Sequence, residues 1–242
     1  MRIGLISDIH GNLVALDAVL ATLDRAEVDR IICLGDLAVL GPEPAGVIDR
    51  IRERGIATVR GNVDDWLTSG ETPEAAPPDS TQSIELTTWT LAQLTASQTE
   101  FLRRLPLTLD VPIDDDRSLL CFHATPGSID DITHAGEPAR VGEWTGNALM
   151  ACGHTHIQAM WRVGDQAWLN PGSVGLPRVG PGTPDLPRNR DVSWAEFALV
   201  EINRYETSVD LRRLELDIGA IRAAAQATDM PHQDWWLNLW RL

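Results

Sequence analysis

The sequence predicts an α/β protein, and three observations support that prediction. Up to about residue 62, short apolar runs typical of strands alternate with segments whose apolar residues recur with the 3.6-residue period of a helix. This alternation implies parallel strands joined by right-handed crossovers. From about residue 118 onward the pattern becomes strand-rich. Several apolar runs end in polar residues that can bind metals, which indicates a site at the carboxyl ends of the strands.

Composition restricts the class of protein. With 242 residues and 43% hydrophobic content, the chain can bury one sizeable core, and we predict a single domain over 1–242. The net charge of −15 argues against stable binding of nucleic acid or of an anionic membrane. Three cysteines without a C-x-x-C pair argue against a disulfide framework. We see neither a signal-peptide pattern nor an apolar run of the roughly 18 residues that span a membrane, so we expect a cytoplasmic protein with no membrane partner.

The first strand and helix place the earliest candidate residues. The apolar run at 3–6 predicts a strand, and Asp8 and His10 follow it on one side, because positions i and i+2 of an extended chain share a face. Asn12 is expected to cap a helix with a buried face of Leu13, Leu16, Leu20 and Leu23. The positive N-terminus of that helix points toward Asp8 and suits an anionic substrate. A strand over Arg30–Leu34 and a helix opened by Pro44 are expected next.

A change in composition marks a lid-like insertion at about 66–106. Residues 69–82 are rich in Pro, Glu, Thr and Ala and predict an irregular loop. Two helices are expected after it, at about Ser83–Leu94 and Ser97–Leu105, with Ser97 and Glu100 forming a capping box. The insertion is long enough to overhang the site.

The second half predicts antiparallel strands and a closing helix. Val163–Gln166 matches a two-residue hairpin turn. Trp194–Ile202 and Ser208–Leu216 read as a further antiparallel pair, and a helix is expected at about Ile218–Ala227.

The C-terminal tail at 230–242 is unusually apolar. It carries Trp235, Trp236 and Trp240 among leucines, and such a segment does not remain in solvent. It either packs on its own domain or forms the contact of a homo-oligomer.

Seven polar residues at the ends of apolar runs are the candidate metal ligands. They are Asp8, His10, Asp36, Asn62, His123, His154 and His156. We expect them to converge, because sites of layered α/β proteins gather at the carboxyl ends of strands. Carboxylate, amide and imidazole ligands suit Mn, Fe, Zn, Co or Ni, and the lack of thiolates argues against a closed structural zinc site.

The order and spacing of these residues resemble the calcineurin-like metallophosphoesterase superfamily. The motifs are Asp8-x-His10, Gly35-Asp36, Gly61-Asn62, His123, Gly153-His154-x-His156 and the run from Asn170 to Arg178. They are most similar to the prokaryotic phosphodiesterase branch typified by YfcE and its ApaH-like relatives. The resemblance implies a four-layer αββα sandwich, in which two mixed β-sheets are flanked by helices.

The resemblance also implies a cofactor of two divalent metal ions, with Mn expected first and Fe, Zn, Ni, Co or Mg as alternatives. One ion would be held by Asp8, His10, Asp36 and His156. The other would be held by Asp36, Asn62, His123 and His154. A carboxylate shared between two cations about 3.5 Å apart lowers their repulsion, which suits Asp36.

The activity that the resemblance implies is hydrolysis of a phosphodiester by in-line attack of a metal-bridging hydroxide. The expected catalytic residues are Asp8, His10, Asp36 and Asn62. The partner would be a small-molecule phosphoester, for example one derived from a nucleotide. Alternatives are a dinucleoside polyphosphate hydrolase, a phosphomonoesterase or protein phosphatase, and, in another class, a non-catalytic metal-binding interaction scaffold.

One position departs from the related phosphoprotein phosphatases. Their Gly-Asn-His-Asp/Glu motif has a histidine that can protonate the leaving group, whereas this chain has Gly61-Asn62-Val63-Asp64. Val63 cannot donate a proton, so a contribution of about 10²- to 10⁴-fold is missing there.

Further residues have two interpretations each. Arg60 binds phosphate or forms a surface ion pair, and Asn12 orients phosphate or only caps its helix. Asp64 is expected to support a ligand histidine, and His134 reaches substrate or lies in solvent. Aromatic and sulfur-bearing candidates are expected in the core, with base stacking or extra ligation as alternatives: Trp66, Trp89, Cys33, Cys121 and Cys152.

Overall fold

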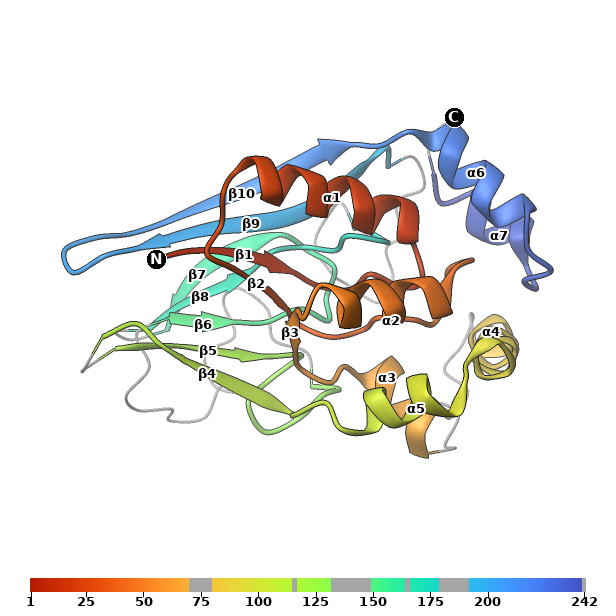
Figure 1. The fold of residues 1–242 in the computed structure, drawn as a ribbon, viewed down its shortest axis with the longest axis horizontal. Helices are drawn as coiled ribbons and strands as arrows, with labels where there is room; N and C mark the ends of the chain where they lie inside the picture. Colours follow the sequence, from red (N-terminus) through yellow and green to blue (C-terminus); the bar gives the residue numbers. More distant parts are fainter. Residues whose placement is uncertain (70–79, 115–116, 132–148, 164–165, 179–191, 241–242) are drawn as a thin grey trace.

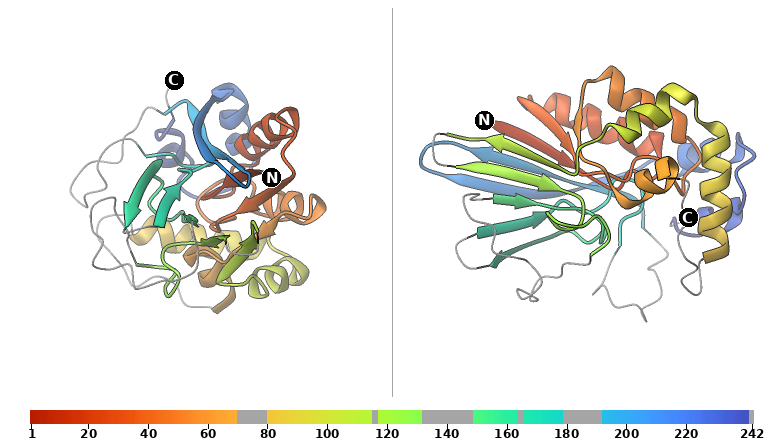
Figure 2. Two further views of the ribbon diagram at one scale, coloured as in Figure 1. Left: turned by 90° about the vertical axis from the view of Figure 1, so that its left-hand side faces the viewer. Right: turned by 90° about the horizontal axis from the view of Figure 1, so that it is seen from below.

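Two five-stranded β-sheets lie face to face in the computed structural model, which describes residues 1–69, 80–114, 117–131, 149–163, 166–178 and 192–240. Figures 1 and 2 show the sheets as two layers. The first sheet contains, in spatial order, β10 (Thr207–Glu215), β9 (Trp194–Ile202), β1 (Arg2–Ile6), β2 (Arg30–Cys33) and β3 (Ala57–Thr58). The second contains β4 (Thr108–Pro112), β5 (Ser118–Phe122), β6 (Leu149–Ala151), β8 (Gln166–Asn170) and β7 (Ala159–Val163). Both sheets combine parallel and antiparallel pairs, as expected.

An apolar core fills the space between the sheets. Leu5 of β1 and Ile32 of β2 belong to one buried cluster with Cys121 of β5 and Leu169 of β8. Strand β1 is parallel to β2 and buried on both faces, which is typical of a strand with helices on one side and a sheet on the other. Strand β1 is therefore enclosed on both faces, and the loops at the ends of the strands are the parts placed to form a site.

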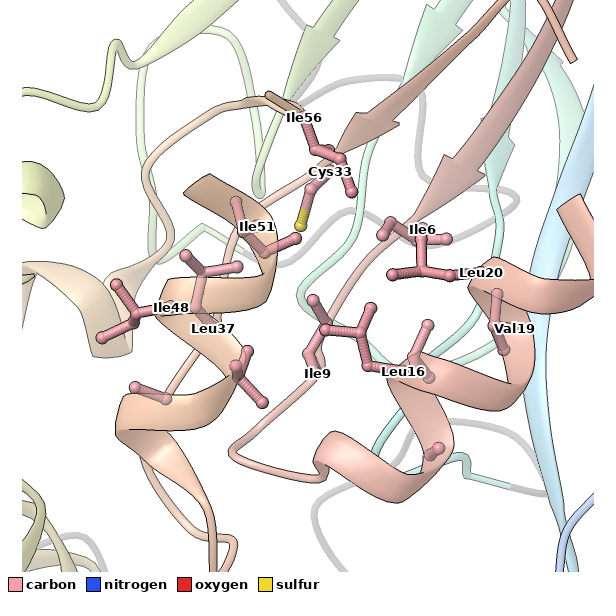
Figure 3. Close-up of a cluster of buried hydrophobic side chains, with 14 of the residues drawn as sticks. Ile6, Ile9, Leu16, Val19, Leu20, Cys33, Leu37, Ile48, Ile51 and Ile56 are labelled. Carbon is pink, nitrogen blue, oxygen red and sulfur yellow. The ribbon is translucent and has the colours of Figure 1, made fainter. Parts of the chain in front are cut away.

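Helices α1 (Leu13–Arg25) and α2 (Pro44–Glu53) cover the outer face of the first sheet. Figure 3 shows the buried cluster between these helices and the sheet, including Leu16, Leu20, Ile48, Ile51 and Ile6. Helix α6 (Ile218–Gln226) packs against α1. The α/β class is thus confirmed, with strands and helices alternating through β3 as the sequence pattern indicates.

The outer face of the second sheet is apolar as well. Phe122, Met150 and Trp168 form a buried cluster on it, and Trp161 packs beside them. Among the described residues, this cluster contains no helical residue.

The described part of the expected insertion contains the end of α3 (Asn62–Ser69) and two further helices, α4 (Ser80–Gln93) and α5 (Ala96–Arg103). Helix α3 contacts α4 and α5, and both of these also contact α2. The pattern did not indicate α3, and most of the expected loop at 69–82 lies outside the described residues. That the insertion acts as a lid stays a prediction.

The capping box of α5 lies two residues earlier than expected. The Thr95 hydroxyl accepts from the Gln98 N–H at 3.3 Å, and the Gln98 side chain accepts from the Thr95 N–H at 2.9 Å. The box predicted at Ser97 and Glu100 is therefore wrong. Thr95 is the last extended residue before the helix, so Ser97 already lies within the first turn.

The strands of the second half agree closely with expectation, with one addition. Strands β7 and β8 form the predicted hairpin, in which Val163 pairs with Gln166, and β9 pairs with β10 in antiparallel register. The sequence pattern did not indicate β4, which pairs with β5 along its whole length. Its Val111 contributes to the core between the sheets.

The tail packs on its own domain. It forms the short helix α7 (Gln233–Leu237), and Trp236 and Trp240 are buried in one cluster with Leu86 of α4 and Ile221 of α6. The first of the two expectations for the tail is therefore met. Among the described helices, none combines the length and the apolar character that crossing a membrane requires.

Candidate metal centre

The seven predicted ligand residues come together where the loops after β1, β2, β3, β5 and β6 meet. Two groups have ligand atoms that all lie within 4.8 Å of one another. The first consists of Asp8, His10, Asp36 and His156, and the second of Asp36, His123 and His154. Asn62 joins the second group through its side-chain oxygen. Asp36 belongs to both groups.

Left-handed backbone conformations place most of these side chains. Asp8, His10, Asp36, His154 and His156 have φ between 49° and 67°. Such a conformation costs free energy for a residue with a side chain and is held only where the surrounding structure enforces it. Each loop thereby turns sharply after its strand and directs its side chain back into the centre.

The first group brings two histidine nitrogens unusually close. His10 Nε2 lies 2.9 Å from His156 Nε2. The Nδ1 of His10 lies 3.0 Å from the Val39 carbonyl and that of His156 lies 2.7 Å from the Leu176 carbonyl. A carbonyl only accepts, so both Nδ1 atoms carry hydrogen and both neutral Nε2 atoms present lone pairs to each other. A cation between them removes this repulsion.

Asp8 supports the same conclusion. Its Oδ1 is buried without a hydrogen-bond partner and lies 3.3 Å from His156 Nε2 and 3.9 Å from His10 Nε2. An unpaired buried carboxylate oxygen is costly. Asp8 Oδ2, by contrast, accepts from the His154 backbone N–H at 3.1 Å. Oδ1 and the two imidazoles therefore form a donor set that fits a divalent cation.

The second group is arranged around Asn62 Oδ1. His123 Nε2 and His154 Nδ1 each lie 3.0 Å from this oxygen. His123 donates its Nδ1 hydrogen to the Leu34 carbonyl at 2.7 Å, which orients Nε2 inward. His154 thus differs from the other three histidines, since it presents Nδ1 to the centre.

Asp36 faces both groups through one oxygen. Its Oδ2 lies 3.4 Å from His123 Nε2 and 3.7 Å from His10 Nε2. Its Oδ1 accepts from the Val63 N–H at 3.1 Å. The carboxylate is consequently anchored by one oxygen and leaves the other to be shared.

Asp64 supports the backbone rather than a ligand histidine. Its carboxylate accepts from the N–H groups of Asp36 and Leu37, both at 2.9 Å, and of Gly61 at 3.0 Å. The expectation that it supports a ligand histidine is wrong, because its side chain points under the loop that carries Asp36. It ties that loop to the turn before Asn62.

Burial and charge set the protonation of the centre without cations. Burial and the nearby His156 lower the pKa of His10 to about 4, and burial with the nearby His123 lowers that of His154 to about 4. Burial alone would lower the pKa of His123, but the facing Asp36 raises it to about 10. Burial opposes ionisation of Asp8 and Asp36, yet the surrounding histidines hold the pKa of both carboxyls below its usual value. The centre is therefore built to keep its carboxylates ionised.

The two predicted substrate-binding residues have partners within the fold, and their contact with substrate stays a prediction. Arg60 donates to the Arg103 and Leu105 carbonyls at 2.6 and 3.0 Å and pairs with Asp65 at 3.2 Å. This is the ion-pair alternative, and it turns the guanidinium toward the end of α5. Asn12 accepts from the Ala15 N–H at 3.1 Å and so caps α1.

The remaining candidates lie in the core where they are described. Cys33, Cys121 and Cys152 are buried in three different apolar clusters. Trp66 packs beside the cluster under α1 and α2, and Trp89 packs beside the tail. His134 lies outside the described residues.

Two glycines, whose role the sequence analysis did not identify, make this close packing feasible. A Cβ atom on Gly61 would lie 2.0 Å from Asp36 Oδ1, and one on Gly153 would lie 2.0 Å from Ser7 Oγ. Their position directly before Asn62 and His154 is the signal that could have found them.

Comparison with known proteins gives consistent matches along most of the chain. Residues 1–186 match the family described as the calcineurin-like phosphoesterase superfamily domain. The uncharacterised protein MJ0912 of Methanocaldococcus jannaschii is 30% identical over 236 residues, covering 89% of this chain and 88% of that protein. Phosphodiesterase YfcE of Escherichia coli is 25% identical over 193 residues, covering 74% of this chain and 83% of its own length.

Solved structures agree with these matches. A metallophosphoesterase from Sphaerobacter thermophilus is 26% identical, with a TM-score of 0.76 over 99% of this chain and 98% of its own. The protein PH1004 of Pyrococcus horikoshii OT3 shares the fold, with a TM-score of 0.78 at 19% identity over 99% of this chain and 98% of its own.

Proposed function

Because the chain belongs to the calcineurin-like phosphoesterase superfamily, within which YfcE confirms the expected branch, we propose that it is a phosphodiesterase that uses two divalent metal ions. The observation that carries this proposal is the pair of donor groups that share Asp36. Asp8, His10 and His156 complete the first group, and Asn62, His123 and His154 complete the second. We propose Mn²⁺ as the preferred ion, on the chemistry of carboxylate, amide and imidazole donors.

The residues of the chain have separate tasks in this proposal. Cations bound in the two groups would lower the pKa of a bound water and neutralise charge on the phosphoryl oxygens. Asp36 Oδ2 faces both groups while Oδ1 is anchored to the Val63 N–H, so Asp36 fixes the spacing of the groups. Three backbone carbonyls hold three of the four imidazoles in the correct tautomer: Val39 for His10, Leu176 for His156 and Leu34 for His123.

A preference for diesters is supported by Val63 and by the similarity to YfcE. Val63 lies in the first turn of α3 with its side chain buried in the core, and it contributes only its N–H to the centre. With no proton donor at that position, esters with acidic leaving groups should react best. The curated relative YfcE is named a phosphodiesterase, in line with this argument.

The test is a hydrolysis screen with several divalent ions over aryl phosphodiesters, cyclic nucleotides, dinucleoside polyphosphates and phosphomonoesters. We expect metal-dependent hydrolysis of diesters, with Asp36→Asn lowering turnover more than about 100-fold because a ligand common to both groups is lost. Asp24→Asn is the matched control, since Asp24 only pairs with Arg54 on the surface.

Other outcomes select the alternatives. Mass analysis that shows cleavage within a polyphosphate chain, with diesters untouched, would favour the dinucleoside polyphosphate hydrolase. The absence of both bound metal and hydrolysis with added Mn²⁺ would refute the enzyme and favour the interaction scaffold.

A further inference from the structure

The loop at 170–178, which follows β8, lies against the loop that carries Asp8. Val174 donates its N–H to the Ser7 carbonyl at 2.9 Å, and Gly175 donates to the Asp8 carbonyl at 3.0 Å. These backbone bonds hold the two loops side by side directly behind the first metal group.

One side chain of this loop joins two of its neighbours. The Ser173 hydroxyl donates to the Asp8 carbonyl and accepts from the Leu176 N–H, both at 2.7 Å. Ser173 is fully buried, so water cannot replace either bond. The hydroxyl therefore adds a buried side-chain bridge between Asp8 and Leu176 to the backbone bond that Gly175 makes with Asp8.

Leu176 in turn orients a ligand. Its carbonyl accepts the Nδ1 hydrogen of His156 at 2.7 Å, and Arg178 donates its N–H to the His156 carbonyl at 3.0 Å. His156 Nε2 then faces Asp8 Oδ1 at 3.3 Å. Ser173 thus connects two ligands of the first group. It contacts Asp8 directly and His156 through Leu176.

The second group is oriented mainly by other parts of the chain, and Asp8 reaches it only through Oδ2, which accepts from the His154 backbone N–H at 3.1 Å. The Leu34 carbonyl orients His123, and Asn62 is placed by the start of α3. His154 meets Asn62 Oδ1 directly. Loss of the Ser173 hydroxyl should consequently affect the two groups unequally.

We propose that Ser173 is a positioning residue that acts chiefly on the first metal group. Its hydroxyl holds Asp8 and His156 at the separation that one cation needs. This inference rests on the proposed function, because it requires that each group binds a cation.

The experiment measures Mn²⁺ affinity in variants that retain one group each. His154→Ala leaves the first group complete, and His10→Ala leaves the second group complete. Ser173→Ala is then added to each variant, and Mn²⁺ binding is followed by calorimetry and by the electron paramagnetic resonance signal of free Mn²⁺. We expect Ser173→Ala to weaken binding by about 10- to 100-fold in the His154→Ala variant and to weaken it clearly less in the His10→Ala variant.

Ser7→Ala is the matched control. Ser7 is also fully buried and lies next to Asp8, but its hydroxyl makes no hydrogen bond. We expect it to leave both affinities unchanged. Ser173→Cys keeps a weak donor and acceptor in place, so the Mn²⁺ affinity of this variant should fall between those of the serine and alanine proteins. It replaces Ser173→Ala in the experiment if the alanine variant does not fold.

The outcomes separate this inference from the proposed function. Equal weakening in both variants, or none in either, would overturn the role of Ser173 while leaving the metal centre intact. Absence of Mn²⁺ binding in the unmodified chain would overturn the proposed function and the role of Ser173 with it.

Discussion

His123 and Asp36 form a buried pair whose charge state depends on the cation. Asp36 raises the pKa of His123 to about 10 against the effect of burial, so at pH 8 the metal-free protein carries a proton on this imidazole. A cation needs the neutral ring, and binding must therefore release that proton. The apparent metal affinity should rise by up to about tenfold per pH unit as the pH increases toward 10, because one proton is exchanged.

The first prediction follows from this exchange. At pH 8, Mn²⁺ binding to the unmodified chain should release about one proton more than binding to His123→Ala. Calorimetry in two buffers with different protonation enthalpies measures the difference. His154→Ala is the control, because burial and His123 lower the pKa of His154 to about 4 and that ring is already neutral. Equal proton release from the unmodified chain and His123→Ala would refute the assignment.

Val63 gives a second prediction at this scale. Its side chain is buried in the core and cannot protonate a leaving group, so the general-acid contribution of about 10²- to 10⁴-fold is absent there. Turnover of an aryl phosphodiester should exceed that of a phosphoserine peptide, whose alkoxide is a poor leaving group. Steady-state rates on both substrates with saturating Mn²⁺ decide the matter, and a strong preference for the peptide contradicts the prediction.

The residues that converge could be predicted, whereas their supporting partners could not. Asp8 and His156 are recognisable because they end apolar runs with short, regular spacings. Asp64 and Arg60 lie beside ligand motifs as well, but their side chains turn to backbone groups that only the folded loops bring near. Proximity in sequence to a ligand does not determine the direction of a side chain.

At the scale of single elements, α5 offers a third prediction. Thr95→Ala removes the capping hydroxyl and should lower the free energy of unfolding by about 1 kcal/mol, with Mn²⁺ affinity unchanged. Ser97→Ala is the matched control, since Ser97 lies inside the helix and accepts only from Arg52 at the surface; it should change stability by less than about 0.5 kcal/mol. Urea denaturation measures both changes in stability. A larger loss in Ser97→Ala than in Thr95→Ala would contradict the cap at Thr95 and favour the cap at Ser97.

The elements that sequence reasoning missed are short or are determined by their surroundings. Strand β4 has only five residues and includes Pro112 at its end, and pairing with β5 rather than composition makes it a strand. Helix α3 begins at Asn62. Because Asn62 also ends an apolar run, the sequence pattern indicates only a ligand after a strand and not the start of a helix. The long periodic segments at α1 and β9, in contrast, lie where the pattern placed them.

At the scale of the whole molecule, the tail joins parts that are distant in sequence. Trp236 is fully buried with Leu86 of α4 and Ile221 of α6. The His232 ring lies 2.8 Å from Glu85, and the Trp89 indole N–H donates to Asp229 at 2.9 Å. The insertion and the C-terminus are thereby fastened to each other, a contact that no local pattern could indicate.

The fourth prediction concerns this contact. Trp236→Ala should destabilise the chain by about 3–5 kcal/mol, because a large buried side chain is lost. Trp235→Ala, which alters a partly buried neighbour, should cost less. Thermal unfolding at several protein concentrations measures both effects. A midpoint that rises with concentration in the unmodified chain but not in Trp236→Ala would instead assign the tail to a subunit contact.

The general architecture could be predicted because the motifs and the alternation of strands and helices agree with each other. The pairing of β9 with β1 could not, since it joins residues about 200 positions apart in the chain, and an antiparallel partner leaves no mark on the sequence of β1. Distant pairing of this kind encloses the core between the sheets.

The absence of side chains at Gly61 and Gly153 has a consequence for the descent of this protein. A methyl group at either position would collide with Asp36 or Ser7 at 2.0 Å, so two chain segments interlock with no slack. Related proteins that evolve a preference for another substrate can exchange the residues around these two glycines. We expect each of them to inherit both glycines, since replacing one would oblige a neighbouring segment to be rebuilt in the same step.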